Sequence, residues 1–159
     1  FLQKNGVYFH PLSIEAQQQV FLSYQVITNQ EMPKKPTSIT ILDRSIPVIA
    51  HTSDVLWCDF KALCSPPRCQ LDYLELAKQY STFIISDVPI IKASHNSVIT
   101  LFIYLIDVLY DTKKNIIISA AASPGGLYTE GDKIFEYQRT VSRIIEMSSS
   151  DYTKKVMDQ

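Results

Sequence analysis

Two short segments, each built on a run of apolar residues, with an apolar helical pattern between them most constrain what this chain can fold into. The segments are Phe83 to Asp87 and Asn115 to Ala120, and the stretch between them, Ser97 to Tyr110, is apolar on nearly every side. Continuous apolar strands are typical of a parallel sheet that is covered by helices on both faces. The order of strand, helix, strand and a further helix therefore predicts a parallel βαβ unit.

The N-terminal part shows different patterns. Residues 13–29 predict a helix with Ser13 as its N-cap. Its predicted apolar stripe consists of Ile14, Ala16, Val20, Phe21 and Tyr24. Residues 38–42 and 46–50, separated by a polar turn, predict a β-hairpin, and residues 55–60 are predicted to add a third strand to that antiparallel unit.

A further helix is predicted for residues 70–80. Its expected apolar face consists of Leu71, Leu74, Leu76 and Ala77. The predicted fold class is α/β, with a parallel βαβ-type sheet covered by helices, an N-terminal helix and an antiparallel β-hairpin element.

Charge and composition exclude some classes of protein. The net charge is -1, so a nucleic-acid surface covering the whole protein is not expected, although pairs such as Lys113-Lys114 leave room for a local basic patch. The most apolar run, residues 98–110, is too short to span a bilayer and contains Asp107. The cysteines are Cys58, Cys64 and Cys69, an odd number without a Cys-x-x-Cys pair, which favours free thiols in a reducing cytoplasm over a metal site or a disulfide framework.

Asp87 is the first candidate site residue, because it ends a predicted parallel strand at the edge where open α/β sheets bind ligands. It could hold Mg²⁺ through water, with Ser119 of the neighbouring strand beside it, or it could cap the turn at Val88-Pro89. No Gly-x-x-x-x-Gly-Lys-Ser/Thr loop and no Gly-x-Ser-x-Gly elbow occur in the sequence. These residues alone are therefore not expected to bind a nucleoside triphosphate tightly.

Arg139 and Arg143 stand one turn apart on the last predicted helix, so they project from one face. They admit three interpretations: pairing with Glu136 and Glu146 of the same helix, contact with a nucleotide phosphate held elsewhere in a longer protein, or contact with a partner protein. Arg68, before the helix at residues 70–80, similarly admits a structural salt bridge or a role in partner binding.

Several stretches together resemble a known family. They are Trp57 to Cys64, Pro67 to Ala77, Ile85 to Pro89, Phe102 to Asp111, Ile117 to Ala121, Leu127-Tyr128 and Phe135 to Met147. In this order, from about Gly6 to Tyr152, the chain resembles the C-terminal portion of the ZapE/Afg-one-like ATPase family, which is AAA+-like. The chain departs from the family pattern at Pro66, Thr100, Leu101 and Gly125-Gly126, and keeps Arg68, Asp72, Asp87, Arg139 and Arg143.

The resemblance implies that residues 1–159 form a single C-terminal domain of a longer ATPase, with a helix and β-hairpin element in 1–60 and an α/β unit in 61–152. The family's phosphate-binding loop and Mg²⁺-binding strand lie upstream, so ATP and Mg²⁺ are expected in the parent protein and no cofactor in this part. The implied partners are the upstream ATPase domain, client or division-ring proteins and, as an option, further copies of the chain. No nucleic acid is expected, and the implied location is the bacterial cytoplasm or, as a second option, the periphery of a membrane.

The residues leave three functions open. The first is a part of a protein-remodelling ATPase that itself lacks hydrolytic chemistry, in which the strands ending at Asp87 and Ser119 form a degenerate nucleotide-site-like half. The second is a non-catalytic interaction or regulatory module. The third is a small enzyme that uses Asp87 and Asp107, which requires both carboxylates to face one cleft.

Overall fold

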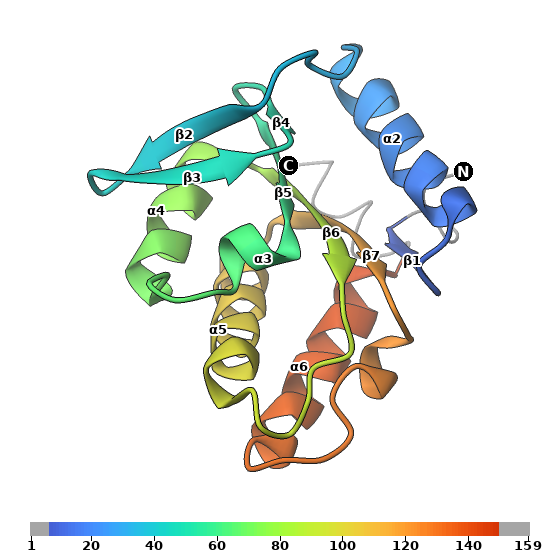
Figure 1. Ribbon diagram of the computed structural model, residues 1–159, viewed down its shortest axis with the longest axis vertical. Helices are drawn as coiled ribbons and strands as arrows, with labels where there is room; N and C mark the ends of the chain where they lie inside the picture. Colours follow the sequence, from blue (N-terminus) through green and yellow to red (C-terminus); the bar gives the residue numbers. More distant parts are fainter. Residues whose placement is uncertain (1–6, 150–159) are drawn as a thin grey trace.

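The computed structural model describes residues 7–149, which form a five-stranded sheet, a separate two-stranded sheet and the helices around them (Figure 1). The strands of the large sheet are β1 (Tyr8–Phe9), β7 (Asn115–Ala120), β6 (Thr82–Val88), β5 (Val55–Asp59) and β4 (Ala50–His51), in that spatial order. All neighbouring pairs are parallel except β4 with β5, which is antiparallel. The predicted parallel α/β fold is therefore confirmed.

The helices are α2 (Ile14–Thr28), α3 (Phe60–Leu63), α4 (Gln70–Gln79), α5 (Asn96–Asp111) and α6 (Ile134–Met147), with a 3₁₀ turn at Pro124–Gly126. The predicted N-cap is confirmed, because the Ala16 amide donates to Ser13 Oγ at 3.1 Å. Of the stripe predicted for α2, Ala16, Val20 and Tyr24 are buried, whereas Ile14 is 70% exposed and was placed on the wrong face.

The predicted hairpin is confirmed as β2 (Thr37–Ile41) and β3 (Arg44–Val48). Its turn lies earlier than predicted, at Leu42 and Asp43, which both have positive φ angles, as a tight two-residue hairpin requires. The third strand was assigned to the wrong sheet. β5 is an interior strand of the large sheet, parallel to β6 on one side and antiparallel to the short β4 on the other, and its residues from Val55 to Cys58 are buried on both faces.

Side chains alternate between the two faces of the large sheet. One face packs into the main core with α3, α4, α5, α6 and the hairpin, and contributes Leu56, Cys58, Phe83, Ile85, Ile116 and Ile118. The other face packs against α2 in a smaller core. That core contains Val55, Trp57, Ile84 and Ile117 from the strands and Val20 and Tyr24 from the helix.

The apolar face predicted for α4 was half wrong. Leu76 and Ala77 are buried together with Tyr73, whereas Leu71 is 64% and Leu74 40% exposed. The helix is rotated so that Asp72 points into the protein, where it meets two arginines. This rotation buries a carboxylate that the apolar pattern would have left on the surface.

Candidate functional site at the carboxyl edge of the sheet

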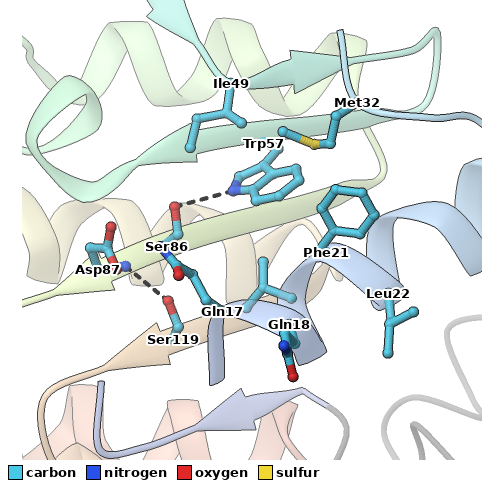
Figure 2. A pocket seen from close by; sticks show the side chains of 11 residues that line it. Gln17, Gln18, Phe21, Leu22, Met32, Ile49, Trp57, Ser86, Asp87 and Ser119 are labelled. Atoms are coloured by element: carbon cyan, nitrogen blue, oxygen red, sulfur yellow. Dashed lines mark hydrogen bonds between the residues drawn. The ribbon is translucent and has the colours of Figure 1, made fainter. Parts of the chain in front are cut away.

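A pocket lies between α2 and the carboxyl ends of β5, β6 and β7 (Figure 2). Its volume is about 570 Å³. The wall from α2 consists of Gln17, Gln18, Val20, Phe21 and Leu22, and the rest of Met32, Ile49, Trp57, Ser86, Asp87 and Ser119. The pocket is thus aromatic and aliphatic in its body and carries hydroxyl and carboxylate groups at one end.

Two hydrogen bonds organise the polar end. The Trp57 indole donates to Ser86 Oγ at 3.1 Å, which fixes the ring as part of the pocket wall. The Asp87 amide donates to Ser119 Oγ at 2.9 Å, so the predicted proximity of Asp87 and Ser119 is confirmed (Figure 2). Asp87 sits at an irregularity in the pairing of β6 with β7 and has a φ of 61°. The strand is therefore kinked at the residue that carries the carboxylate.

The carboxylate of Asp87 is exposed and makes no ion pair or hydrogen bond within residues 7–149, so it does not cap the turn at Val88-Pro89 as the alternative interpretation had it. A second acid, Asp59, ends the neighbouring strand β5 and accepts a hydrogen bond from the Lys61 amide at 3.2 Å. Burial raises the pKa of the Asp59 carboxyl, and the charge of Asp87 adds to that rise while the Lys61 amide opposes it. The polar end of the pocket is therefore electronegative.

Arg139 and Arg143 lie elsewhere, on the face of α6 that packs against α5. Arg143 forms a close ion pair with Asp107, and its guanidinium carbon lies 4.8 Å from the centre of the Tyr110 ring. Arg139 is farther from the same carboxylate, at 3.9 Å, and its side chain is 64% exposed. Because Asp107 is bound to α6, it does not face the pocket that Asp87 lines, and the two acids do not form one site.

The glutamates expected to pair with these arginines have other partners. Glu136 lies 3.7 Å from the ammonium group of Lys133, and Glu146 accepts a hydrogen bond from the Tyr110 hydroxyl at 2.8 Å. Of the three interpretations, the one that paired the arginines with glutamates of α6 was therefore wrong. The arginines instead join α6 to α5, because Asp107 of the neighbouring helix lies between them.

Arg68 has a structural role, as one of its two interpretations proposed. Its side chain donates to the Ser45 carbonyl at 3.0 Å and lies 3.9 Å from the buried carboxylate of Asp72. Asp72 also forms a close ion pair with Arg44 of the hairpin and accepts from the Cys69 amide at 3.0 Å. These contacts fasten β3 to the start of α4.

The cysteines are free thiols: Cys58 and Cys64 are buried and Cys69 is half-buried. Within residues 7–149, no group of three or more His, Cys, Asp or Glu side chains is placed to hold a metal ion. Nor does any helix of this part of the chain combine the length and apolar character that crossing a membrane requires.

Sequence reasoning found Asp87 and Ser119 but missed the rest of the pocket. Phe21 had been assigned to the buried stripe of α2, and Trp57 to the hairpin unit. The only signal for the pocket was the polar Ser86 at a buried position next to Asp87 in an otherwise apolar strand. The contribution of α2 could not be seen because it depends on how that helix crosses the sheet.

The fold and its edge site define an open-sheet α/β protein, a class whose ligands or partners bind at the carboxyl ends of the strands. The family model described as AFG1-like ATPase matches residues 1–156, and the chain belongs to this family. The cell division protein ZapE of Escherichia coli K12 is 29% identical over 155 residues, which cover 97% of this chain and 41% of that protein.

Two eukaryotic relatives match as well. A Schizosaccharomyces pombe protein is 33% identical over 108 residues, 68% of this chain and 23% of its own length. Lactation elevated protein 1 homolog B of Danio rerio is 26% identical over 150 residues, 74% of this chain and 30% of its own. The chain thus spans less than half the length of each relative. No solved structure matches it.

Proposed function

We propose that this chain is the C-terminal, non-hydrolytic domain of a longer protein that binds and hydrolyses ATP and acts on other proteins. The observation that carries the proposal is the match of an ATPase family over residues 1–156 of a sequence that contains no phosphate-binding loop. Mg²⁺ and the triphosphate would be held by the rest of the polypeptide. Because the Escherichia coli relative is named a cell division protein, division-ring proteins in a bacterial cytoplasm are the first partners to test.

The two arginines would then have different roles. Arg143 is committed to Asp107 and Tyr110, with only 21% of its side chain exposed, so it would position α6 against α5. Arg139 is three times as exposed and only loosely paired, so it is the one able to reach a nucleotide held by the rest of the protein. A guanidinium that neutralises charge developing on a phosphate belongs to the chemistry of such enzymes.

The test is ATP hydrolysis by the full-length protein with Arg139→Ala. We expect a fall in kcat of about a hundredfold, the usual cost of losing one charge-stabilising donor. Lys133→Ala is the control, because Lys133 is also a partly exposed cation at the start of α6 and, among residues 7–149, pairs with Glu136 of the same helix. Unchanged hydrolysis in Arg139→Ala would exclude the nucleotide contact, and a gene without an upstream phosphate-binding loop would overturn the ATPase proposal itself.

The second candidate function is a non-catalytic interaction or regulatory module. It is favoured by the burial of Arg143 in a contact within the domain and by the apolar pocket beside α2. Loss of partner binding in Arg139→Ala with normal hydrolysis would support it. The strands that end at Asp87 and Ser119 would in either case be a degenerate nucleotide-site-like half, and micromolar binding of ATP to this chain alone in calorimetry would contradict that.

A further inference from the structure

The two faces of the large sheet are covered unequally (Figure 1). On one face, α4, α5 and α6 contribute to a continuous core, whereas on the other face α2 is the only helix among residues 7–149 that packs on the strands. Parallel sheets are normally covered by helices on both faces, because their strands are apolar on both sides. The layer that contains α2 is therefore incomplete in this part of the protein.

α2 also exposes apolar side chains among its polar ones. Ile14 is 70%, Leu22 45% and Val26 63% exposed, and we call these three residues the outer α2 face. A surface helix usually carries polar residues opposite its buried stripe. Here the buried stripe contacts the sheet, and the three apolar residues lie at the surface together with Glu15 and Gln18. Leu22 also lines the pocket beside the strand ends. Apolar residues that gather on an exposed surface mark a site of interaction.

The outer α2 face is continuous with a groove at the carboxyl edge of the sheet. The pocket that Leu22 lines shares Gln17, Asp87 and Ser119 with a second pocket of about 290 Å³, which Ile14 lines. The two pockets therefore adjoin along α2, with Asp87, whose carboxylate has no partner among residues 7–149, in the wall of both. A groove of this shape suits an extended or helical segment with apolar side chains and a basic group near Asp87.

We infer that the outer α2 face and this groove are the docking surface for the ATPase portion that precedes this domain in the same polypeptide. The inference rests on the proposed function. The matched region is 41% of the Escherichia coli relative, so most of such a protein lies outside it. Val7 packs in the smaller core with α2, and β1 lies beside α2.

A tethered segment also has an advantage over a second copy of the chain. A short connection gives the linked portion an effective concentration of about a millimolar, far above the concentration of free copies in a dilute solution. The preceding portion would complete the missing layer over α2, place apolar side chains in the groove and bring a Lys or Arg to Asp87.

Hydroxyl-radical footprinting of the full-length protein tests this inference with an internal control. Leu22 and Val26 are 45% and 63% exposed in this domain, and Leu74 and Leu71 of α4 are 40% and 64% exposed. We expect severalfold slower oxidation of Leu22 and Val26 than of Leu74 and Leu71, measured by mass spectrometry. Equal oxidation rates at the two pairs of residues would overturn the inference. Protection of Leu22 and Val26 that disappears when an oligomer is diluted to monomers would overturn it too, because the occupant would then be a second copy of the chain.

A matched pair of double variants provides an independent measurement. In the full-length protein, Leu22→Gln with Val26→Gln should raise the oxidation of Phe21 and Met32, which border the groove, severalfold. Leu71→Gln with Leu74→Gln should leave it unchanged. ATP hydrolysis by the same unsubstituted sample distinguishes the proposed function from the docking surface. Absence of hydrolysis counts against the proposed function, whereas hydrolysis without protection of α2 counts against the docking surface alone.

Discussion

Replacing Asp72 by Asn should be one of the most destabilising single changes in this domain. The side chain of Asp72 is fully buried, forms a close ion pair with Arg44 and lies 3.9 Å from Arg68. It also accepts the Cys69 amide at 3.0 Å at the start of α4. Asparagine is nearly the same size, so the change removes the negative charge and leaves the packing almost intact.

The size of the loss in stability depends on the arginine charges that the substitution leaves without a counter-ion. Arg68 is only 9% exposed and its Nη1 atom makes no hydrogen bond within the described residues, so without the Asp72 charge a positive charge would remain buried with no counter-ion. Removing one partner of a buried ion pair costs about 3–5 kcal/mol. Arg44 is 36% exposed, so its guanidinium can be hydrated once Asp72 loses its charge. We therefore expect the free energy of unfolding to fall by about 3 kcal/mol, the lower end of that range. The total stability of a domain this size is about 5–15 kcal/mol.

Urea unfolding followed by circular dichroism measures this loss. With a slope of about 2 kcal/mol per molar urea, the midpoint should fall by about 1.5 M. Glu75→Gln is the matched control, because Glu75 also lies on α4 but pairs with Lys78 at the surface, where we expect a change below about 0.5 kcal/mol. A loss below about 1 kcal/mol for Asp72→Asn would refute the argument that the buried charges depend on one another.

Two further predictions concern the loop before α6 and the thiols. Gly131 has a φ of 138°, and a Cβ atom there would lie 2.0 Å from the Tyr128 hydroxyl, so Gly131→Ala should cost about 2–4 kcal/mol in thermal unfolding. Gly125→Ala, which meets nothing within 4 Å, should change stability by less than about 0.5 kcal/mol. Burial raises the pKa of Cys58 to about 12, so iodoacetamide at pH 8 should label Cys69 in the native protein and Cys58 only after unfolding. Equal labelling rates of the two thiols in the native protein would contradict this.

The elements whose character is set by their own residues were predictable from the sequence. β6, α5 and β7 follow from apolar runs that only a covered parallel sheet or a buried helix can accommodate. The partner of a strand is a different matter. β5 follows a hairpin in the sequence and resembles its strands, but it pairs with β6, whose residues lie more than twenty positions away.

The rotation of α4 shows a second limit of sequence reasoning. Leu71 and Leu74 predicted an apolar face, but the helix turns Tyr73 and Asp72 inward instead. The Tyr73 hydroxyl donates to the Leu63 carbonyl, and Asp72 meets Arg44 of the hairpin. Both partners come from other elements, so the residues of α4 alone could not reveal which of its faces would be buried.

The same limit applies to the candidate site. That Asp87 and Ser119 would lie together followed from parallel strands whose carboxyl ends meet at one edge. The pocket wall formed by Phe21 and Trp57 depends on the path of α2 across the sheet, which no local pattern encodes. The parts of the site that belong to one βαβ unit were therefore predictable, and the part contributed by a distant helix was not.

The arginine pair shows why a cationic helix face is weak evidence for an external anion. Two guanidinium groups one turn apart need counter-charge when their helix packs, and a neighbouring helix supplies it most simply with one carboxylate placed between them. Asp107 of α5 does this for Arg143 at close range and for Arg139 at 3.9 Å. The sheet edge offers the opposite case, because Asp87 is a charge without a partner among residues 7–149, beside an apolar groove. An exposed carboxylate beside unburied apolar surface offers a partner both a charge and a contact area, so the search for what this chain binds should begin at Asp87 and α2.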